Sequence, residues 1–211
     1  MMLISEQLQK KFDGITNILN QIGERVEGNL ICDVSPNNIV IDRNEEKIHN
    51  LQQLSIGKNK ICEIGVNAGH SLLIMLEQNP TAEYLLFDLG NHRYTKPCVE
   101  YIKMQYPNTK ITIIYGDSKK TIPNFITTNP NEIESFDLVH IDGGHGMLEF
   151  TSDFYNCRYL ASSDGISIFD DYDYNEIGTF INHNLNALTI KKYENSTIKE
   201  TNKHFLYTIV R

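Results

Sequence analysis

The sequence predicts an α/β protein built around a doubly wound, mostly parallel sheet. Short apolar runs alternate with helical patterns from residue 60 onward. Several of these runs are almost continuously apolar, as buried parallel strands are, and two β-type runs close the chain. With 211 residues the chain is long enough for one sizeable core and too short for two full domains. We therefore expect one α/β domain with an extension.

Residues 1–56 are expected to form a helical extension that packs on a main domain of residues 57–211. Apolar residues between Ile4 and Ile22 recur at steps of three and four, which is the stripe of an amphipathic helix. A second helical pattern covers residues 45–54, whereas residues 28–44 hold only a short apolar run that is hard to interpret. The first helix could also serve a homodimer.

The main domain alternates expected strands and helices in chain order. The expected strands are residues 60–65, 83–90, 110–117, 136–142 and 165–171. The expected helices are residues 70–78, 95–105, 122–127, 147–160 and 176–188. The runs 188–194 and 204–211 are separated by polar residues, and they predict a C-terminal antiparallel hairpin.

Composition narrows the classes of partner and location. The formal net charge of −8 argues against nucleic acid or an anionic membrane as the main partner. The first residues lack the pattern of a signal peptide, and no apolar run approaches the roughly 20 residues of a membrane span. The four cysteines form no CxxC pair, which argues against zinc and favours a reducing, cytoplasmic location. Cys62 and Cys157 lie in apolar segments and are expected to be buried thiols.

Acidic residues follow every expected parallel strand, at the edge where sheets of this kind bind ligands. Five purely structural strands would not need an acid at each end. The acids are Glu63, Asp88, Asp117, Asp142, Asp170 and Asp171.

The loop after the first of these strands, EIGVNAGHS at residues 63–71, suits an anionic or ribose-bearing ligand. It lacks the lysine of a P-loop, and Asn67 stands where the second glycine of GxGxxG would be. Asp88 lies 23 residues after Gly65 and could accept both hydroxyls of a ribose. The first two strands therefore fit either NAD or S-adenosylmethionine (SAM).

The order of motifs over residues 60–211 resembles the class I SAM-dependent methyltransferases, which have a Rossmann-like, seven-stranded sheet with an antiparallel seventh strand. The matching motifs are ExGxxxGxS, the acid after the second strand, GDS after the third and FDLVHID on the fourth. The resemblance implies that Asp88 holds the ribose of SAM and that Asp117 and Ser118 flank the adenine. The residues that it places around SAM are Glu63, Gly65, Asn67, Ala68, Gly69, Ser71, Asp88, Leu89, Gly116, Asp117, Ser118 and Asp142.

IDGGH followed by IFDD resembles the metal-dependent small-molecule O-methyltransferases, both macrocin-type sugar enzymes and their catechol-type relatives. The resemblance implies that Asp142, Asp170 and Asp171 bind Mg²⁺, because carboxylate oxygens are its preferred ligands. A metal-bound hydroxyl has a lowered pKa, and His145, three residues after Asp142, is expected to be the general base.

The expected function is therefore SAM-dependent methylation of a hydroxyl on a small molecule of the sugar or phenol type. Two alternatives stay open: an NAD(P)-binding oxidoreductase, and a module that binds SAM without catalysis. His145 could also be an ordinary residue at a helix N-terminus, and Asp170 and Asp171 could belong to a plain acidic loop. His140, which alternates inside the fourth strand, is expected to be a buried core histidine.

Overall fold

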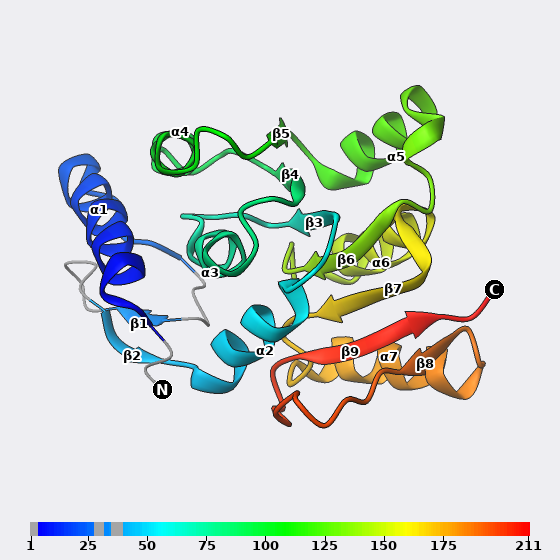
Figure 1. The fold of residues 1–211 in the computed structure, drawn as a ribbon. Coiled ribbons are helices and arrows are strands. Elements are labelled where there is room, and N and C mark those ends of the chain that lie inside the picture. The colour runs from blue at the N-terminus through cyan, green and yellow to red at the C-terminus, as the bar shows by residue number, and fades with distance from the viewer. Residues whose placement is uncertain (1–3, 28–31, 35–39) are drawn as a thin grey trace.

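The computed structural model describes residues 4–27, 32–34 and 40–211, and Figure 1 shows their arrangement. Seven strands form one sheet in the order β5-β4-β3-β6-β7-β9-β8. Their bounds are β3 (Lys60–Ile64), β4 (Glu83–Asp88), β5 (Ile111–Tyr115), β6 (Phe136–Ile141), β7 (Ala161–Phe169), β8 (Ile190–Lys192) and β9 (Phe205–Ile209).

Strands β3 to β7 pair in parallel, whereas β9 runs antiparallel to both β7 and β8. The chain reverses its direction of winding at β3, which has β4 on one side and β6 on the other. The predicted doubly wound sheet with an antiparallel C-terminal hairpin is confirmed. Because the parallel strands share one direction, their carboxyl ends meet at one edge, and the switch between β3 and β6 opens a crevice there.

The helices cover both faces of the sheet and divide its core in two. One core joins α1 to α4 with residues such as Ile61 and Leu138, and the other joins α5 to α7 with residues such as Cys62 and Val139. Successive residues of a strand point to opposite faces, so neighbours such as Ile61 and Cys62 enter different cores. The helices are α1 (Glu6–Ile22), α2 (Glu45–Ser55), α3 (His70–Gln78), α4 (Thr95–Gln105), α5 (Ser118–Thr128), α6 (Met147–Leu160) and α7 (Asn175–Asn186).

Two main-domain elements begin earlier than the sequence predicted. Helix α5 starts at Ser118 rather than at Ile122, because the Asp117 side chain accepts a hydrogen bond from the Lys119 N–H and caps the helix. Strand β7 starts at Ala161 rather than at Gly165, so its first residues include polar ones that an apolar pattern does not mark.

The N-terminal extension is not wholly helical. Short strands β1 (Cys32–Val34) and β2 (Val40–Arg43) form a separate antiparallel pair within the stretch that the sequence left uninterpreted. Residues 28–31 and 35–39 of that stretch lie outside the described residues. The predicted helices on either side are both present, as α1 and α2.

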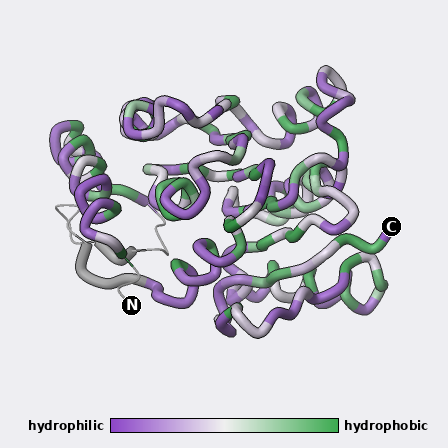
Figure 2. The backbone as a smooth tube through the Cα atoms, in the orientation of Figure 1, coloured by the Kyte–Doolittle hydropathy of each residue, from purple (hydrophilic) through white to green (hydrophobic). Residues whose placement is uncertain are grey.

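Helix α1 attaches the extension to the main core. Figure 2 shows that hydrophilic and hydrophobic residues alternate along this helix, and Figure 1 shows it beside α3 and α4. Its apolar stripe is buried, and the Phe12 ring lies 5.4 Å from the His70 ring of α3. Lys11 also forms an ion pair with Glu77 of α3, at 2.7 Å. The extension and the main domain therefore share one core.

Cys62, Cys98 and Cys157 are buried free thiols, as expected for the first and last of them. Burial raises the pKa of the Cys98 thiol to about 12 and the pKa of the other two well above the usual value. None of the helices in the described part of the chain is both long enough and apolar enough to cross a membrane.

Phe12→Ala should lower the free energy of unfolding by about 3–5 kcal/mol, because it leaves a cavity in the shared core. Urea denaturation measures this loss. Met104→Ala on α4 is the matched control, since Met104 is 69% exposed, and it should change stability by less than about 0.5 kcal/mol. A separate early transition for the extension would contradict a shared core.

Candidate active site

A cavity of about 530 Å³ opens at the carboxyl ends of β3 to β6. Its volume falls in the range of small-molecule and cofactor sites. Among the residues that were predicted to contact a ligand, those lining it are Gly65, Asn67, Asp88, Leu89, Gly116, Asp117, Ser118, Asp142 and His145.

Gly65 brings the first loop against the end of β6. Its φ is +85°, and a Cβ there would lie 1.8 Å from the Asp142 carbonyl oxygen, so a larger residue cannot take its place. The Gly65 N–H donates to the Phe87 carbonyl oxygen of β4 at 2.8 Å. The loop is thereby fixed between the ends of two strands, and Asp142 is held at the cavity.

Asp88 accepts backbone hydrogen bonds from two different loops. Its Oδ2 accepts the N–H groups of Val66 and Asn67, at 2.9 and 2.8 Å, and its Oδ1 accepts the Gly90 N–H at 2.7 Å. A carboxylate has four lone-pair positions, and three of those on Asp88 are therefore occupied. The sequence predicted that Asp88 could accept both hydroxyls of a ribose, but only one position, on Oδ1, remains open.

Four predicted ligand contacts do not line the cavity: Glu63, Ala68, Gly69 and Ser71. Glu63 is fully buried and accepts hydrogen bonds from Ser71 Oγ at 2.5 Å and His140 Nδ1 at 3.0 Å. His140 is buried, as expected, and is also part of this polar network. Glu63 and Ser71 thus support the first loop and its helix from behind.

Asp117 and Ser118 stand on the opposite wall of the cavity, at the start of α5. Asp117 caps the helix, and its carboxylate lies 3.7 Å from Lys119 Nζ. Lys119 also forms an ion pair with Glu149 of α6. This wall therefore carries a fixed pattern of charges beside the N-terminus of α5.

Asp142 and His145 line this cavity, and Asp171 lies beside them. One ligand atom of each lies within 4.8 Å of the other two. His145 Nε2 lies 2.5 Å from Asp171 Oδ2, and the carboxylate accepts the N–H of the ring. Asp171 has a φ of +56°, and its Oδ1 is buried without a hydrogen-bond partner among the described residues. Such an unusual backbone and an orphaned carboxylate oxygen are typical of functional sites.

Neighbouring charges shift the pKa values of both Asp142 and His145. Burial and the nearby Asp170 carboxylate raise the pKa of Asp142 well above its usual value. The hydrogen bond to Asp171 raises the pKa of His145 and outweighs the effect of its partial burial. A carboxyl that resists ionisation and an imidazole paired with an acid are thus held side by side.

Asp170 points away from this group and into a second one. Its Oδ2 forms an ion pair with Lys47 Nζ of α2, and its Oδ1 lies 3.6 Å from His204 Nε2. His140 Nε2 lies 4.0 Å from Oδ2. The predicted metal set of Asp142, Asp170 and Asp171 is therefore split, because consecutive residues at a strand end point to opposite sides.

Lys47 and His204 are site residues that the sequence reasoning missed. A signal for Lys47 was present, since it precedes Leu51 by four residues and Leu54 by seven and so lies on the apolar stripe of its helix. A lysine on such a stripe needs a buried acid as its partner. His204 precedes Leu206 by two residues, so it shares that residue's face of the sheet.

A family model described as a methyltransferase domain matches residues 62–172, more than half of the chain. The matched region includes the first loop, Asp88, Asp142, His145 and both acids after β7. No curated protein shows significant similarity to the sequence.

Solved structures of low sequence identity share the fold. A Podospora anserina methyltransferase bound to S-adenosylhomocysteine aligns with a TM-score of 0.66 at 14% identity, covering 99% of this chain and 89% of that one. The O-methyltransferase TomG of Streptomyces achromogenes, from tomaymycin synthesis and in complex with SAM, has a TM-score of 0.63 at 12% identity, with coverages of 99% and 92%. A TDP-rhamnose 3′-O-methyltransferase of calicheamicin biosynthesis gives 0.61 at 15%, with coverages of 97% and 95%.

Asp88→Asn should lower the free energy of unfolding by about 1–3 kcal/mol, because an amide group must turn its NH₂ toward one set of backbone donors. Urea denaturation measures this change. Asp164→Asn, at an exposed position on β7, is the control and should leave stability nearly unchanged. If both variants unfold like the parent protein, the three backbone hydrogen bonds to Asp88 do not hold the loop.

Proposed function

The chain belongs to the family of methyltransferase domains, and from this premise we propose that it transfers a methyl group from SAM to a hydroxyl of a small molecule. The observation that carries the proposal is the His145–Asp171 pair beside Asp142, where His145 and Asp142 line a cofactor-sized cavity. The fold is that of class I SAM-dependent methyltransferases. Hydroxyl methylation is further supported by the names of two similar structures, both O-methyltransferases.

The proposed binding site for SAM is the cavity between the loop after β3 and the start of α5. The open lone-pair position on Asp88 Oδ1 suits one ribose hydroxyl. Asp117 and Ser118 follow β5 and would flank the adenine. The methionine part of SAM would then extend along Gly65 and Asn67 toward Asp142, which would bring the sulfonium methyl close to Asp142 and His145.

His145 is the proposed general base. Its Nε2–H is bound by Asp171, which leaves Nδ1 as the nitrogen that accepts a proton. As the acceptor oxygen attacks the methyl carbon, the carbon–sulfur bond breaks and neutral S-adenosylhomocysteine leaves. The hydroxyl proton moves to Nδ1, and Asp171 stabilises the resulting imidazolium. The sulfonium is already reactive, so positioning and deprotonation are what the protein must add.

Mg²⁺ is also proposed to assist methyl transfer, but with fewer protein ligands than the sequence suggested. A carboxylate oxygen of Asp142 and the orphaned Oδ1 of Asp171 are the oxygen atoms that suit it. When bound, Mg²⁺ would lower the pKa of the acceptor hydroxyl. Asp170 is excluded from this set because Lys47 already neutralises it.

The acceptor is proposed to be a sugar or a phenol, as the similar TDP-rhamnose enzyme suggests for the first class. The other proposals that come from the sequence are a cytoplasmic location, no nucleic-acid or membrane partner, and an extension of residues 1–56 beside a catalytic domain of residues 57–211.

Calorimetry with SAM and with NAD separates the two classes of cofactor. We expect SAM and S-adenosylhomocysteine to bind with micromolar affinity and NAD to show no binding heat. Asp88→Ala should weaken SAM binding about tenfold or more through loss of the ribose contact. Binding of NAD without SAM would overturn the proposal, and methyl transfer at full rate in EDTA would remove Mg²⁺ from it.

The pH dependence of methyl transfer should report His145. Only the neutral imidazole accepts a proton, so kcat should rise as the pH increases through the raised pKa of His145. Asp171→Asn removes the main cause of that rise, and we expect the acid limb of the profile to move to lower pH while the plateau falls about 10²-fold or more.

Asp173→Asn is the matched control for this profile, because Asp173 is exposed and pairs with Lys203 rather than with His145. Its profile should follow that of the parent protein. A profile that is unchanged in Asp171→Asn would show that another group takes the proton.

A further inference from the structure

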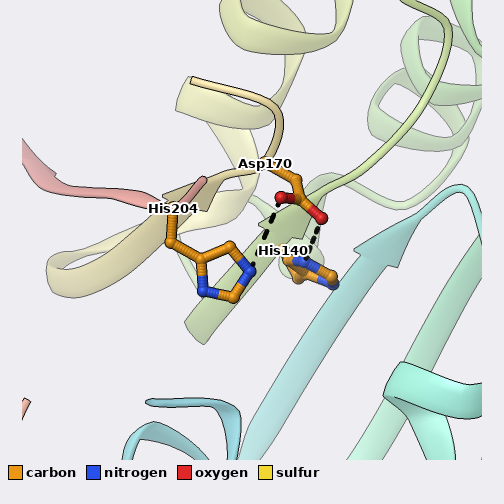
Figure 3. A group of neighbouring side chains, drawn as sticks. All are labelled: His140, Asp170 and His204. Carbon is orange, nitrogen blue, oxygen red and sulfur yellow. Dashed lines mark ion pairs between the residues drawn. The ribbon is translucent and has the colours of Figure 1, made fainter. Parts of the chain in front are cut away.

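Three side chains gather on the other side of the strand ends, apart from the proposed base. Figure 3 shows His140 of β6, His204 beside β9 and Asp170 beyond β7 pointing toward one another. One ligand atom of each lies within 4.8 Å of the other two, and all three residues are buried. Two imidazoles and a carboxylate are a usual ligand set for a first-row transition-metal dication.

The sheet register explains why these residues meet. Glu63 pairs with His140 across β3 and β6, His140 with Ile168 across β6 and β7, and Ile168 with Leu206 across β7 and β9. Asp170 follows Ile168 by two residues, and His204 precedes Leu206 by two. All of these side chains consequently point to the face of the sheet that α1 to α4 cover.

Each of the two histidines has a buried ring nitrogen without a hydrogen-bond partner among the described residues. His140 donates its Nδ1–H to the Glu63 carboxylate, so the lone pair of its Nε2 faces Asp170. This is the arrangement by which an outer carboxylate prepares a metal-binding histidine. His204 has no hydrogen-bond partner for either ring nitrogen among the described residues, and burial lowers its pKa to about 3.

A cation already occupies this group, and it comes from the N-terminal extension. Lys47 Nζ of α2 contacts Asp170 Oδ2, and the lysine is 0% exposed. Lys47 is the only lysine or arginine that pairs with Asp170 within the described part of the chain. An ammonium and a dication cannot both take the same carboxylate in so buried a place, because their charges repel strongly there.

We propose that Lys47 is the resident cation of a latent metal site formed by His140, Asp170 and His204, and that it acts as a positioning residue for catalysis. The positioning runs through Asp170, whose Oδ1 accepts the Asp171 N–H at 2.8 Å. That hydrogen bond holds the left-handed backbone from which Asp171 reaches His145. The catalytic half of this inference rests on the proposed function, whereas the ion-binding half does not.

The ion-binding half is tested by titrating Co²⁺ into the full chain and into Lys47→Met, with visible absorption and calorimetry as readouts. Removing the ammonium exposes two imidazoles and a carboxylate, so Lys47→Met should bind one Co²⁺ more than the parent protein. The variant should bind that ion at least about tenfold more tightly than the parent protein does, because the repelling ammonium charge of Lys47 is gone. The additional ion should be lost in the double variant Lys47→Met/Asp170→Asn.

Lys47→Met leaves the Asp170 charge buried and unpaired, so this variant is expected to fold poorly. A second measurement, of thermal stability, tests ion binding even in that case. Co²⁺ should raise the melting temperature of this variant by more than it raises that of Lys47→Met/Asp170→Asn, in which only the Asp142 and Asp171 oxygens remain for an ion. The inference is overturned if Lys47→Met gains neither an ion nor thermal stabilisation. It is equally overturned if the parent protein binds Co²⁺ through Asp170 with Lys47 in place.

The catalytic half is tested by the kinetics of the same variant. Lys47→Met should lower kcat about tenfold or more while the affinity for SAM changes less than about threefold. Lys11→Met is the matched control, since Lys11 is also a buried lysine of the extension but pairs with Glu77, away from the strand ends. Equal kcat values for the two variants would overturn the positioning role. Absence of methyl transfer in every protein would refute the proposed function and leave the ion-binding result standing.

Discussion

The constraint on which this structure depends is the crowding of several buried and half-buried carboxylates at one edge of a parallel sheet. A buried charge needs a partner, and here the acids find different ones. Asp88 uses backbone N–H groups from two loops, Asp171 uses His145, and Asp170 uses Lys47. Asp142 has no hydrogen-bond donor for its carboxylate among the described residues, and burial and the nearby Asp170 carboxylate raise its pKa. The site is thus built so that one acid is left for a ligand or an ion.

The partner of Asp170 links the strand-end acids to a part of the chain that the family match does not include. The match begins at residue 62, whereas Lys47 belongs to α2. Burial favours the neutral form of the Asp170 carboxyl, yet the contact with the Lys47 ammonium holds the pKa of this carboxyl low, at about 2. Removing one partner of a buried ion pair strongly destabilises a protein, because the other charge is left unpaired. Helix α2 must therefore stay packed against the sheet for the strand ends to keep their arrangement. The extension is therefore a structural component of the site.

Much of the fold could be predicted because its strands are almost continuous apolar runs that end in acids. The same feature placed Asp142 and His145 correctly beside the second acidic strand end. The division between Asp170 and Asp171 was also within reach, since alternation allows only one of two consecutive side chains to join Asp142. The pairing of Lys47 with Asp170 was not, because it spans 123 residues and depends on how α2 docks. The start of α5 was missed because a capping side chain, not an apolar residue, determines it.

The central claim is that the acids at the strand ends are divided between a resident lysine and the reaction. A crystal structure with S-adenosylhomocysteine and Mn²⁺, whose anomalous scattering locates the ion, tests it most directly. We expect the nucleoside beside Asp88, the ion between Asp142 and Asp171, and Lys47 still paired with Asp170. An ion bound to Asp170 with Lys47 displaced, or a nucleoside outside this cavity, would contradict the claim.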